Sequence, residues 1–571
     1  MSDESINRLL RRVDWRFLLS NPRPKKSILF IEGMLAEAVK LVSDTTVSPE
    51  HNSTNQDCDL AVLSDPDELS LRLAYSSLVP GGYCYVEWGI HLLSKSNSIM
   101  KKLNSAGFDV IELYLPKPSP TATSPKIWIP LSSKRPIKYF MNNNFLRNNS
   151  KVLIRIARSL RLLLWSISPK FFMAYPGLFS LFLSTFIISS IARKPLSTKK
   201  DRLLNKDNKN LNNKTTTSYH STNYLTKTIE LSLKTLGLYK KSGRKPILMI
   251  NPGRNTFNKS LLLVFAEKES KPSLVLKNTR TKKYGNYLIN EARILKTLNN
   301  THENINGIPR VLSYSYKSGI FSLGETYVDG TQLRFILTKN NYRELSLRLT
   351  SWLIDFALGT KTKLPDNWKT SFISNVLSDL SLSLGSELQQ EFIQQTKEIL
   401  TKLNIPNLIC EHKDFTPQNI HIDDKGRIGV LDWEESKLFG LPGVDLIYFL
   451  TRMNYNYYNA RSEEKDYTFQ YRRQLYRGML NESTFTGKIT KECINLYATR
   501  VGIDNSAMDK IRLMTWLIQL HKEIPNIPEL LHKEIPNSPE ETKLKSVPEF
   551  LNANIAFALW EEEIFYQKGK T

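Results

Sequence analysis

Residues Cys410–Leu450 read CEHKDFTPQNIHIDDKGRIGVLDWEESKLFGLPGVDLIYFL and are the most informative part of this chain of 571 residues. His412, Asp414 and Asn419 lie close together in a polar segment, and an apolar run follows that ends at Asp432. Short apolar runs bounded by turn residues are typical of buried strands. We therefore expect a polar loop, then a strand, then a carboxylate at the end of that strand.

These side chains suit phosphoryl transfer. The reaction needs a carboxylate that orients the attacking hydroxyl and accepts its proton, and oxygen ligands that hold Mg²⁺ against nucleotide phosphates. Asp414 can provide the first function, and Asn419 and Asp432 can bind the metal. The pattern therefore predicts a site for ATP and Mg²⁺.

The spacing resembles a known signature, His412-x-Asp414-x-x-x-x-Asn419 followed by Leu431-Asp432-Trp433-Glu434. It is that of the aminoglycoside phosphotransferase and choline kinase-like family, which is related to the protein kinases. The resemblance implies an α+β, bilobal, protein-kinase-like fold for the C-terminal half. It also implies transfer of phosphate from ATP to a hydroxyl of a small molecule.

The resemblance further implies a role for each residue of the motif. Asp414 would be the catalytic base, His412 would support the loop, and Asn419 and Asp432 would be the magnesium ligands. Asp445, in Gly443-Val-Asp445-Leu, matches a family aspartate with a more structural role.

Lys413 departs from the family pattern, which usually has glycine at this position. A lysine there adds charge beside the base and puts the efficiency of the enzyme in doubt.

The nucleotide-binding part is expected upstream. The run Pro272-Ser-Leu-Val-Leu-Lys277 predicts a strand that ends in lysine, and Glu291 lies on a predicted amphipathic helix that follows. Kinases bind phosphate oxygens with a strand lysine and pair it with a glutamate of the next helix. We therefore predict that Lys277 and Glu291 bind the nucleotide.

Two further segments complete the predicted nucleotide site. The hairpin around Gly253 would cover the phosphates with backbone N–H groups, although it has one glycine and not a repeated set. The segment from Glu325 through Tyr327 to Val328 resembles the connector between kinase lobes, whose backbone would bind adenine.

The first 195 residues predict a different sheet. Strand-like runs alternate with segments that could be helical, which favours a small α/β sheet with helical crossovers. The runs are Ser27–Ile31, Leu60–Leu63, Tyr83–Trp88 and Val110–Leu113.

Residues Lys26–Leu115 resemble the second half of a class I methyltransferase, on the Pro-Gly-Gly turn that ends at Gly82 and on Ala-Gly-Phe108. A cofactor site would need a glycine-rich turn after the first strand, so that the backbone could approach the ligand. Only Glu32-Gly33 stands there. The prediction is a truncated Rossmann-like methyltransferase sheet that does not methylate; a methyltransferase with an unusual S-adenosylmethionine turn is the alternative.

The predicted organisation is therefore a degenerate methyltransferase-like domain at 1–195, a basic flexible linker at 196–223, an ATP-binding lobe at 224–328 and a helical lobe at 329–571. The linker is rich in Lys, Asn and Thr and buries too little apolar surface to offset the cost of ordering. An ordered loop is the alternative.

Residues 171–192 carry no charge over a length that could span a bilayer. Lys151, Arg155, Arg158 and Arg161 precede them on one predicted helical face, which could lie on an anionic membrane surface. Pro176, Gly177 and several Ser and Thr residues argue against a span, and Phe186-Ile-Ile-Ser-Ser-Ile resembles the last strand of the methyltransferase sheet. A buried helix and strand, membrane association and a true span all remain open.

Composition restricts the class of protein further. Four cysteines without metal-ligand or redox spacing argue against disulfides and zinc, and favour the cytoplasm. The net charge of +24 favours anionic partners, or it reflects a Lys- and Asn-rich composition.

Residues 454–477 interleave tyrosines with arginines, a pattern that could stack bases but is more often an amphipathic helix hairpin. We therefore expect no nucleic acid partner. Glu434 and Glu435 could favour a cationic acceptor, or they could form salt bridges.

The first functional hypothesis is a small-molecule kinase that uses ATP and Mg²⁺. The alternatives are a nucleotide-binding scaffold without catalysis and a methyltransferase. A scaffold has no chemical need for Lys277, Glu291, Asp414, Asn419 and Asp432 together, so the sequence favours the kinase.

Overall fold

The structure of the protein is a computed structural model that describes residues 3–19, 21–49, 57–89, 96–117, 126–142, 188–195, 224–240, 245–251, 259–301, 305–317, 319–383, 387–458, 469–523 and 554–568. The predicted linker 196–223, the apolar residues 171–187 and Gly253 lie outside the described residues. The chain forms two compact units: unit 1 is Met1–Ala292 with Arg310–Tyr327, and unit 2 is Arg293–Pro309 with Val328–Thr571.

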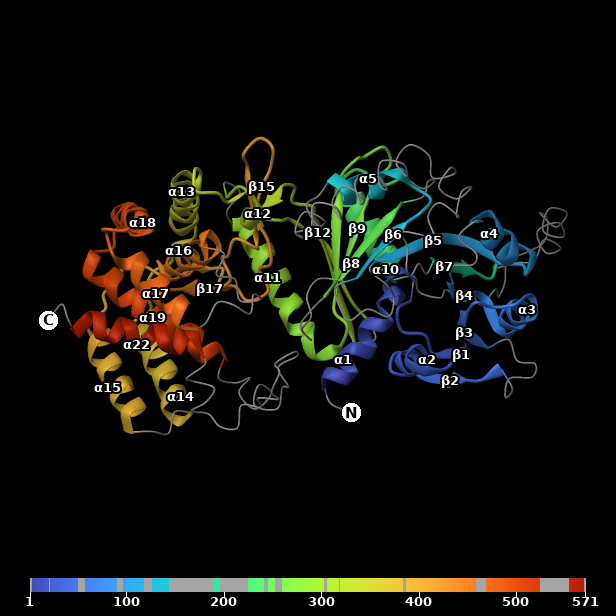
Figure 1. The fold of residues 1–571 in the computed structure, drawn as a ribbon, viewed down its shortest axis with the longest axis horizontal. Coiled ribbons are helices and arrows are strands. Elements are labelled where there is room, and N and C mark those ends of the chain that lie inside the picture. Colours follow the sequence, from blue (N-terminus) through green and yellow to red (C-terminus); the bar gives the residue numbers. More distant parts are fainter. Residues whose placement is uncertain are drawn as a thin grey trace, which may run out of the picture. The chain divides into compact units, whose positions relative to one another are not determined.

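Unit 1 combines the N-terminal part with the strands of the predicted ATP-binding lobe (Figure 1). Its N-terminal elements are α1 (Asp3–Arg12), η1 (Asp14–Leu18), β1 (Lys26–Phe30), α2 (Gly33–Lys40), β2 (Thr45–Val47), β3 (Cys58–Ser64), α3 (Glu68–Ser77), β4 (Leu78–Trp88), α4 (Ser96–Ser105), β5 (Asp109–Lys117), β6 (Lys126–Pro130), α5 (Lys134–Asn142) and β7 (Ile188–Arg193). The later elements are α10 (Tyr224–Thr235), β8 (Ile247–Asn251), β9 (Ser260–Val264), β10 (Leu274–Asn278), η5 (Lys282–Tyr284), α11 (Gly285–Thr301), β11 (Val311–Lys317) and β12 (Ile320–Thr326). The four runs predicted in the first 195 residues and the run that ends at Lys277 overlap β1, β3, β4, β5 and β10.

The strands of unit 1 form one twelve-stranded sheet in the order β11-β12-β10-β9-β8-β6-β5-β7-β4-β3-β1-β2 (Figure 1). Strands β2, β1, β3 and β4 are parallel, and β7 runs antiparallel between β4 and β5. Strands β8–β12 pair antiparallel. The two parts join where β6 pairs antiparallel with β8, in the register Ile127↔Ile250.

One face of this sheet has a single apolar core from end to end. Trp15, Phe17 and Val39 from the N-terminal helices lie in the same cluster as Met249 of β8 and Leu276 of β10. Trp15 stacks on Tyr85 with ring centroids 3.7 Å apart. Because burial of apolar side chains is the main favourable contribution to folding, this shared core makes the N-terminal part and the strands β8–β12 one folded body.

The opposite face is covered in separate sections. Helices α3 and α4 cover β1, β3 and β4, helix α5 covers β8 and β9, and α11 packs on β12 through Leu288. The parallel part is therefore covered on both faces, as parallel sheets normally are. Alternation along each strand sends odd and even residues to opposite faces, so Leu276 enters the shared core and Lys277 points to the other side.

Unit 2 is mainly helical, with two small sheets (Figure 1). Its elements are β13 (Thr331–Gln332), α12 (Leu333–Ile336), α13 (Tyr342–Thr360), the π-helical turn η6 (Thr370–Ser374), α14 (Asn375–Ser383), α15 (Glu387–Thr401), β14 (Ile409–Glu411), β15 (Ile420–Ile422), β16 (Ile428–Val430), β17 (Lys437–Gly440), α16 (Val444–Tyr457), α17 (Phe469–Leu480), α18 (Phe485–Val501), α19 (Asn505–Glu523) and α22 (Ile555–Lys568). The sheet of β8–β12 followed by a helical unit is the α+β arrangement expected for the C-terminal half.

The predicted strand near residue 188 is confirmed as β7, whose Ile191 and Ala192 are buried. Among the described residues, none of the helices combines the length and the apolar character that crossing a membrane requires.

Candidate active site

Lys277 lies on β10 and binds two buried carboxylates. Its Nζ is 2.7 Å from Glu291 of α11 and 2.7 Å from Glu325 of β12. Val275 of β10 pairs with Glu325, so Lys277 is the diagonal neighbour of Glu325 on the same face of the sheet. The predicted Lys277–Glu291 pair is present in unit 1, and its function in nucleotide binding stays a prediction.

The burial of this cluster is nearly complete: Lys277 is 5% exposed, Glu325 1% and Glu291 0%. Burial raises the pKa of Glu325 to about 7, while the charge of Lys277 acts in the opposite direction. Lys259, just before β9, approaches Glu291 at 3.8 Å. A lysine between carboxylates is held in place, and phosphate oxygens could compete for it because they carry the same charge as the carboxylates.

Two features of this cluster were not predicted from the sequence. Glu325 was expected to contribute its backbone to the connector, yet Glu325 belongs to β12 and its carboxylate binds Lys277. Lys259 was not singled out, although it immediately precedes the apolar strand β9. Tyr327 places its hydroxyl 2.9 Å from that of Tyr139 in α5.

In unit 2 the loop from His412 to Asn419 is fixed at its start by Asp445, in the first turn of α16. The Asp445 carboxylate accepts hydrogen bonds from the backbone N–H groups of His412 (2.6 Å) and Lys413 (2.9 Å). Asp445 is 5% exposed, and burial raises its pKa to about 6 while these two bonds oppose the rise. This geometry agrees with the structural role expected of Asp445.

His412 connects the start of the loop to the end of β16. Its Nε2 lies 3.0 Å from the carbonyl oxygen of Leu431, and its Nδ1 accepts a hydrogen bond from the N–H of Asp414 at 3.3 Å. These partners require a neutral ring with the proton on Nε2. The ring is fully buried and packs edge-on against Trp433 at 4.6 Å. His412 therefore supports the loop and has no free nitrogen for proton transfer.

Lys413 adopts a left-handed backbone conformation, with φ of +67°. Glycine adopts this conformation without steric cost, whereas a side chain adds about 1–2 kcal/mol of strain. The backbone of the loop thus explains why the resemblance leads one to expect glycine at this position.

Asp414 and Asn419 face each other across the loop. The Asn419 Nδ2 donates to the Asp414 carboxylate at 2.7 Å and to its backbone carbonyl at 3.0 Å. This leaves the Asn419 Oδ1 as an oxygen ligand. The Leu431 N–H donates to the Asn419 carbonyl at 2.8 Å, next to the Ile420↔Val430 pair of β15 and β16.

Burial raises the pKa of Asp414 to about 7. The charge of Lys522 on α19 opposes the rise most strongly, and the charges of Glu435 and Asp432 add to it. A general base is most effective when its pKa is close to the working pH. Asp414 therefore has the ionisation expected of a base that acts near neutrality.

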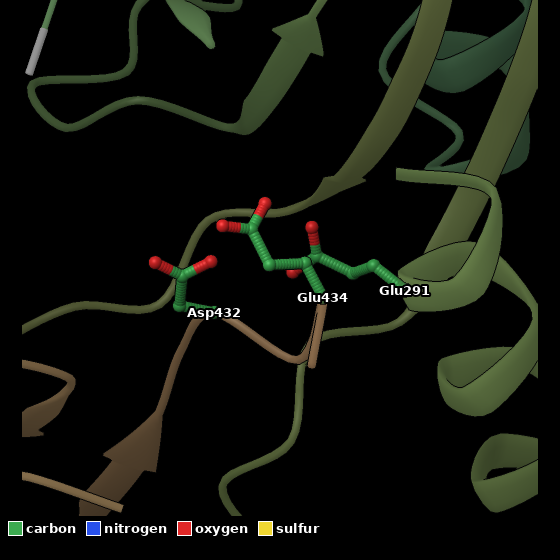
Figure 2. A group of neighbouring side chains, drawn as sticks. All are labelled: Glu291, Asp432 and Glu434. Carbon is green, nitrogen blue, oxygen red and sulfur yellow. The ribbon is translucent and has the colours of Figure 1, made fainter. Parts of the chain in front are cut away.

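Asp432 and Glu434 follow β16, and Figure 2 shows the side chains of both. Asp432 has a φ of +69°, a conformation that aspartate tolerates better than most residues. The carboxylate of Asp432 and the Oδ1 of Asn419 are hard oxygen donors on adjoining segments. This set of ligands fits Mg²⁺.

Glu435 forms a short ion pair with Lys522, so the salt-bridge alternative holds for Glu435. Lys522 was missed at the sequence level because it stands more than one hundred residues from Asp414, on a helix with no motif of its own.

Part of the chain is similar to a known protein family. Residues 262–479 match the family model described as the phosphotransferase enzyme family (APH). The match includes β10, α11, the loop 412–419 and α16. No curated protein matches the chain.

Several solved aminoglycoside phosphotransferases resemble the chain at low identity. A thermostable mutant of APH(4)-Ia, apo form, is 12% identical with a TM-score of 0.32, covering 58% of this chain and 94% of that one. APH(3'')-Id from Streptomyces rimosus, in complex with ADP and streptomycin, is 15% identical with a TM-score of 0.29, covering 46% and 90%. The streptomycin-ATP-APH(2")-IIa ternary complex is 15% identical with a TM-score of 0.32, covering 58% and 97%. The family model and these three structures give no support to the methyltransferase resemblance of the N-terminal part.

Proposed function

We propose that the protein is a phosphotransferase that uses ATP and Mg²⁺ and phosphorylates a hydroxyl group of a small molecule. The observation that carries the proposal is the half-buried Asp414, whose carboxylate is oriented by Asn419 on a loop anchored by Asp445. The match of residues 262–479 to the phosphotransferase family supports it independently.

In this proposal Asp414 accepts the proton of the acceptor hydroxyl as the hydroxyl oxygen bonds to the γ-phosphorus of ATP. The bond from that phosphorus to the β–γ bridging oxygen breaks, and ADP leaves. Lys277, held between Glu291 and Glu325, binds phosphate oxygens and offsets their charge. The hairpin of Gly253 and the backbone near Glu325 and Tyr327 complete the nucleotide site.

Asn419 and Asp432 would hold Mg²⁺, which when bound supplies positive charge against the phosphate oxygens. His412 keeps Asp414 in place through the bond from the Asp414 N–H to its Nδ1. Its function in this proposal is to position the base.

The test is turnover of Mg-ATP by the full chain against sugars, amino alcohols and aminoglycosides. Asp414→Asn should lower kcat by about 10²–10⁴-fold, the usual contribution of a positioned base. Asp424→Asn is the matched control, because it makes the same change on an exposed turn of unit 2. If Asp414→Asn keeps its turnover, Asp414 is not the catalytic base. Binding of ATP without turnover of any acceptor would support a nucleotide-binding scaffold.

We propose further that the N-terminal part is a truncated Rossmann-like methyltransferase sheet without methyl transfer. The parallel order β2-β1-β3-β4, with β1 at the point where the order reverses, supports the relation. The single Gly33 after β1, with a φ of +71°, supports the loss of the cofactor turn. Calorimetric titration with S-adenosylmethionine should give no heat, and binding heat would favour a methyltransferase.

A further inference from the structure

One face of helix α16 begins beside the loop that carries Asp414. Asp445, which anchors the loop, is followed at helical spacing by Tyr448, Arg452 and Tyr455, so these four side chains share that face. The charge of Arg452 acts on both Asp414 and Tyr448. The face therefore begins near the proposed base and continues along α16 within unit 2.

Three polar atoms along this face and its neighbour α17 are buried without a hydrogen-bond partner in the described part of the chain: Nε of Arg452, Nε of Arg472 and the hydroxyl of Tyr455. Tyr455 is only 4% exposed, and the charges of Arg452 and Arg472 both act on its hydroxyl. Buried polar groups are nearly always paired, and an unpaired group calls for an explanation such as a missing ion.

The other arginines of α17 are different. Arg477 donates to the carboxylate of Glu562 at 2.7 Å, and Arg473 also binds Glu562. Among the described residues neither Arg452 nor Arg472 has an ion pair, although each is half-buried. Among the described residues, unit 2 thus supplies a carboxylate to Arg473 and Arg477 and none to Arg452, whose charge acts on Asp414, or to Arg472, whose charge acts on Tyr455 beside Arg452.

We infer that Arg452, Arg472 and Tyr455 form a binding site for a negatively charged group of the acceptor, so that the substrate is an alcohol carrying a phosphate or a carboxylate. The inference rests on the proposed phosphotransferase function. Arginine suits it because its planar guanidinium binds carboxylate and phosphate with two parallel hydrogen bonds. Asp414 and Glu435, whose charges act on Tyr448 of the same face, are engaged by Asn419 and Lys522.

An anion-binding site argues against the cationic acceptor that Glu434 and Glu435 could favour. A cationic acceptor would meet two guanidinium groups on α16 and α17, while the carboxylate of Glu435 is already neutralised by Lys522. Like charges brought together at a binding site reduce affinity. Aminoglycosides should therefore be poor acceptors.

Calorimetry of the full chain with inorganic phosphate and with acetate, at constant ionic strength set by chloride, tests the site. Phosphate, acetate or both should bind to the parent protein. Arg452→Gln and Arg472→Gln should each weaken this binding by about tenfold or more, as expected for a hydrogen bond to a charged group. Arg477→Gln, which removes the same charge from the same helix, should leave it unchanged. Arg472→Lys should recover part of the affinity.

Three results would overturn the inference: no binding of either anion, equal binding in all variants, or displacement of phosphate by a non-hydrolysable ATP analogue. Displacement would assign the two arginines to the nucleotide.

The same experiment separates this inference from the proposed function. Anion binding that is lost in both arginine variants, without turnover of any acceptor, would support the anion site and refute the phosphotransferase. Turnover of neutral or cationic acceptors with unchanged KM in Arg472→Gln would support the phosphotransferase and refute the anion site.

Discussion

At the scale of single residues, the backbone conformation at Lys413 leads to a specific prediction about stability. Lys413→Gly should be more stable than Lys413→Ala by about 1 kcal/mol, because both remove the half-buried side chain but only glycine relieves the left-handed strain. Denaturant unfolding of the two variants measures the difference. Equal free energies of unfolding would show that the loop relaxes around this position.

Glu411, the last residue of β14, predicts a pH dependence of stability. Burial raises its pKa to about 8, the nearby charge of Asp445 adds to the rise, and its Oε1 is buried without a partner. Its carboxyl therefore keeps its proton in the folded chain at a pH where the unfolded chain has released it. Stability from this group is present below its ordinary pKa and is lost as pH rises through the folded pKa.

The thermal midpoint of Glu411→Gln, measured between about pH 5 and about pH 9, should fall less steeply than that of the parent protein. Glu398→Gln, on the exposed side of α15, is the control and should follow the parent curve. A parent curve with the same slope as Glu411→Gln would contradict the raised pKa.

Residues of the candidate site were predictable where the chemistry requires a fixed spacing. The loop from His412 to Asn419 and the Lys277–Glu291 pair followed from such spacing. Lys259, Lys522 and the side chain of Glu325 did not, because each reaches its partner through tertiary packing and carries no local pattern. For the same reason, only the structure shows that Arg452 and Arg472 have no carboxylate partner among the described residues.

At the scale of elements, the short helix η1 is linked to the strand that carries Lys277. Asp14 accepts two hydrogen bonds of 2.8 Å from Arg280, just beyond β10, and both side chains are buried. Asp14→Asn should destabilise unit 1 by about 3–5 kcal/mol, because it leaves a buried guanidinium without its counter-charge.

The free energy of unfolding of the full chain measures this cost. Asp44→Asn breaks the exposed Arg23–Asp44 pair and should cost less than about 1 kcal/mol. Similar values for the two variants would mean that Arg280 finds another partner.

Strands were found from their apolar runs, and their bounds were close to those observed. In the sheet of unit 1, strands β2, β6 and β11 were not singled out. Strand β2 is only three residues long and leaves little periodicity to detect, whereas the alternation of Ser and Tyr in β11 is a strand signal that was overlooked.

At the scale of the whole molecule, the N-terminal part and strands β8–β12 share one sheet and one core. A fragment of residues 224–571 should therefore fail to melt cooperatively, because β8 would lose β6 and the core would lose Trp15 and Phe17. An unpaired apolar edge strand also favours aggregation. Differential scanning calorimetry of the fragment and of the full chain makes the comparison, and a fragment that melts like the full chain would refute it.

The sequence did not predict that the N-terminal part and strands β8–β12 share one sheet. Pairing between β6 and β8 depends on segments separated by the whole predicted linker, and each strand pattern is equally compatible with an edge and with a central position. Local patterns therefore suggested two sheets where the chain builds one.

The pairing of β6 with β8 also has a consequence for biosynthesis. The chain leaves the ribosome from its amino end, so β6 emerges well before β8. At the usual rate of about 5–20 residues per second, the outer edge of β6 waits on the order of ten seconds for its neighbour. Nascent chains of this protein thus pass through a period in which a chaperone that shields extended backbone would increase their yield.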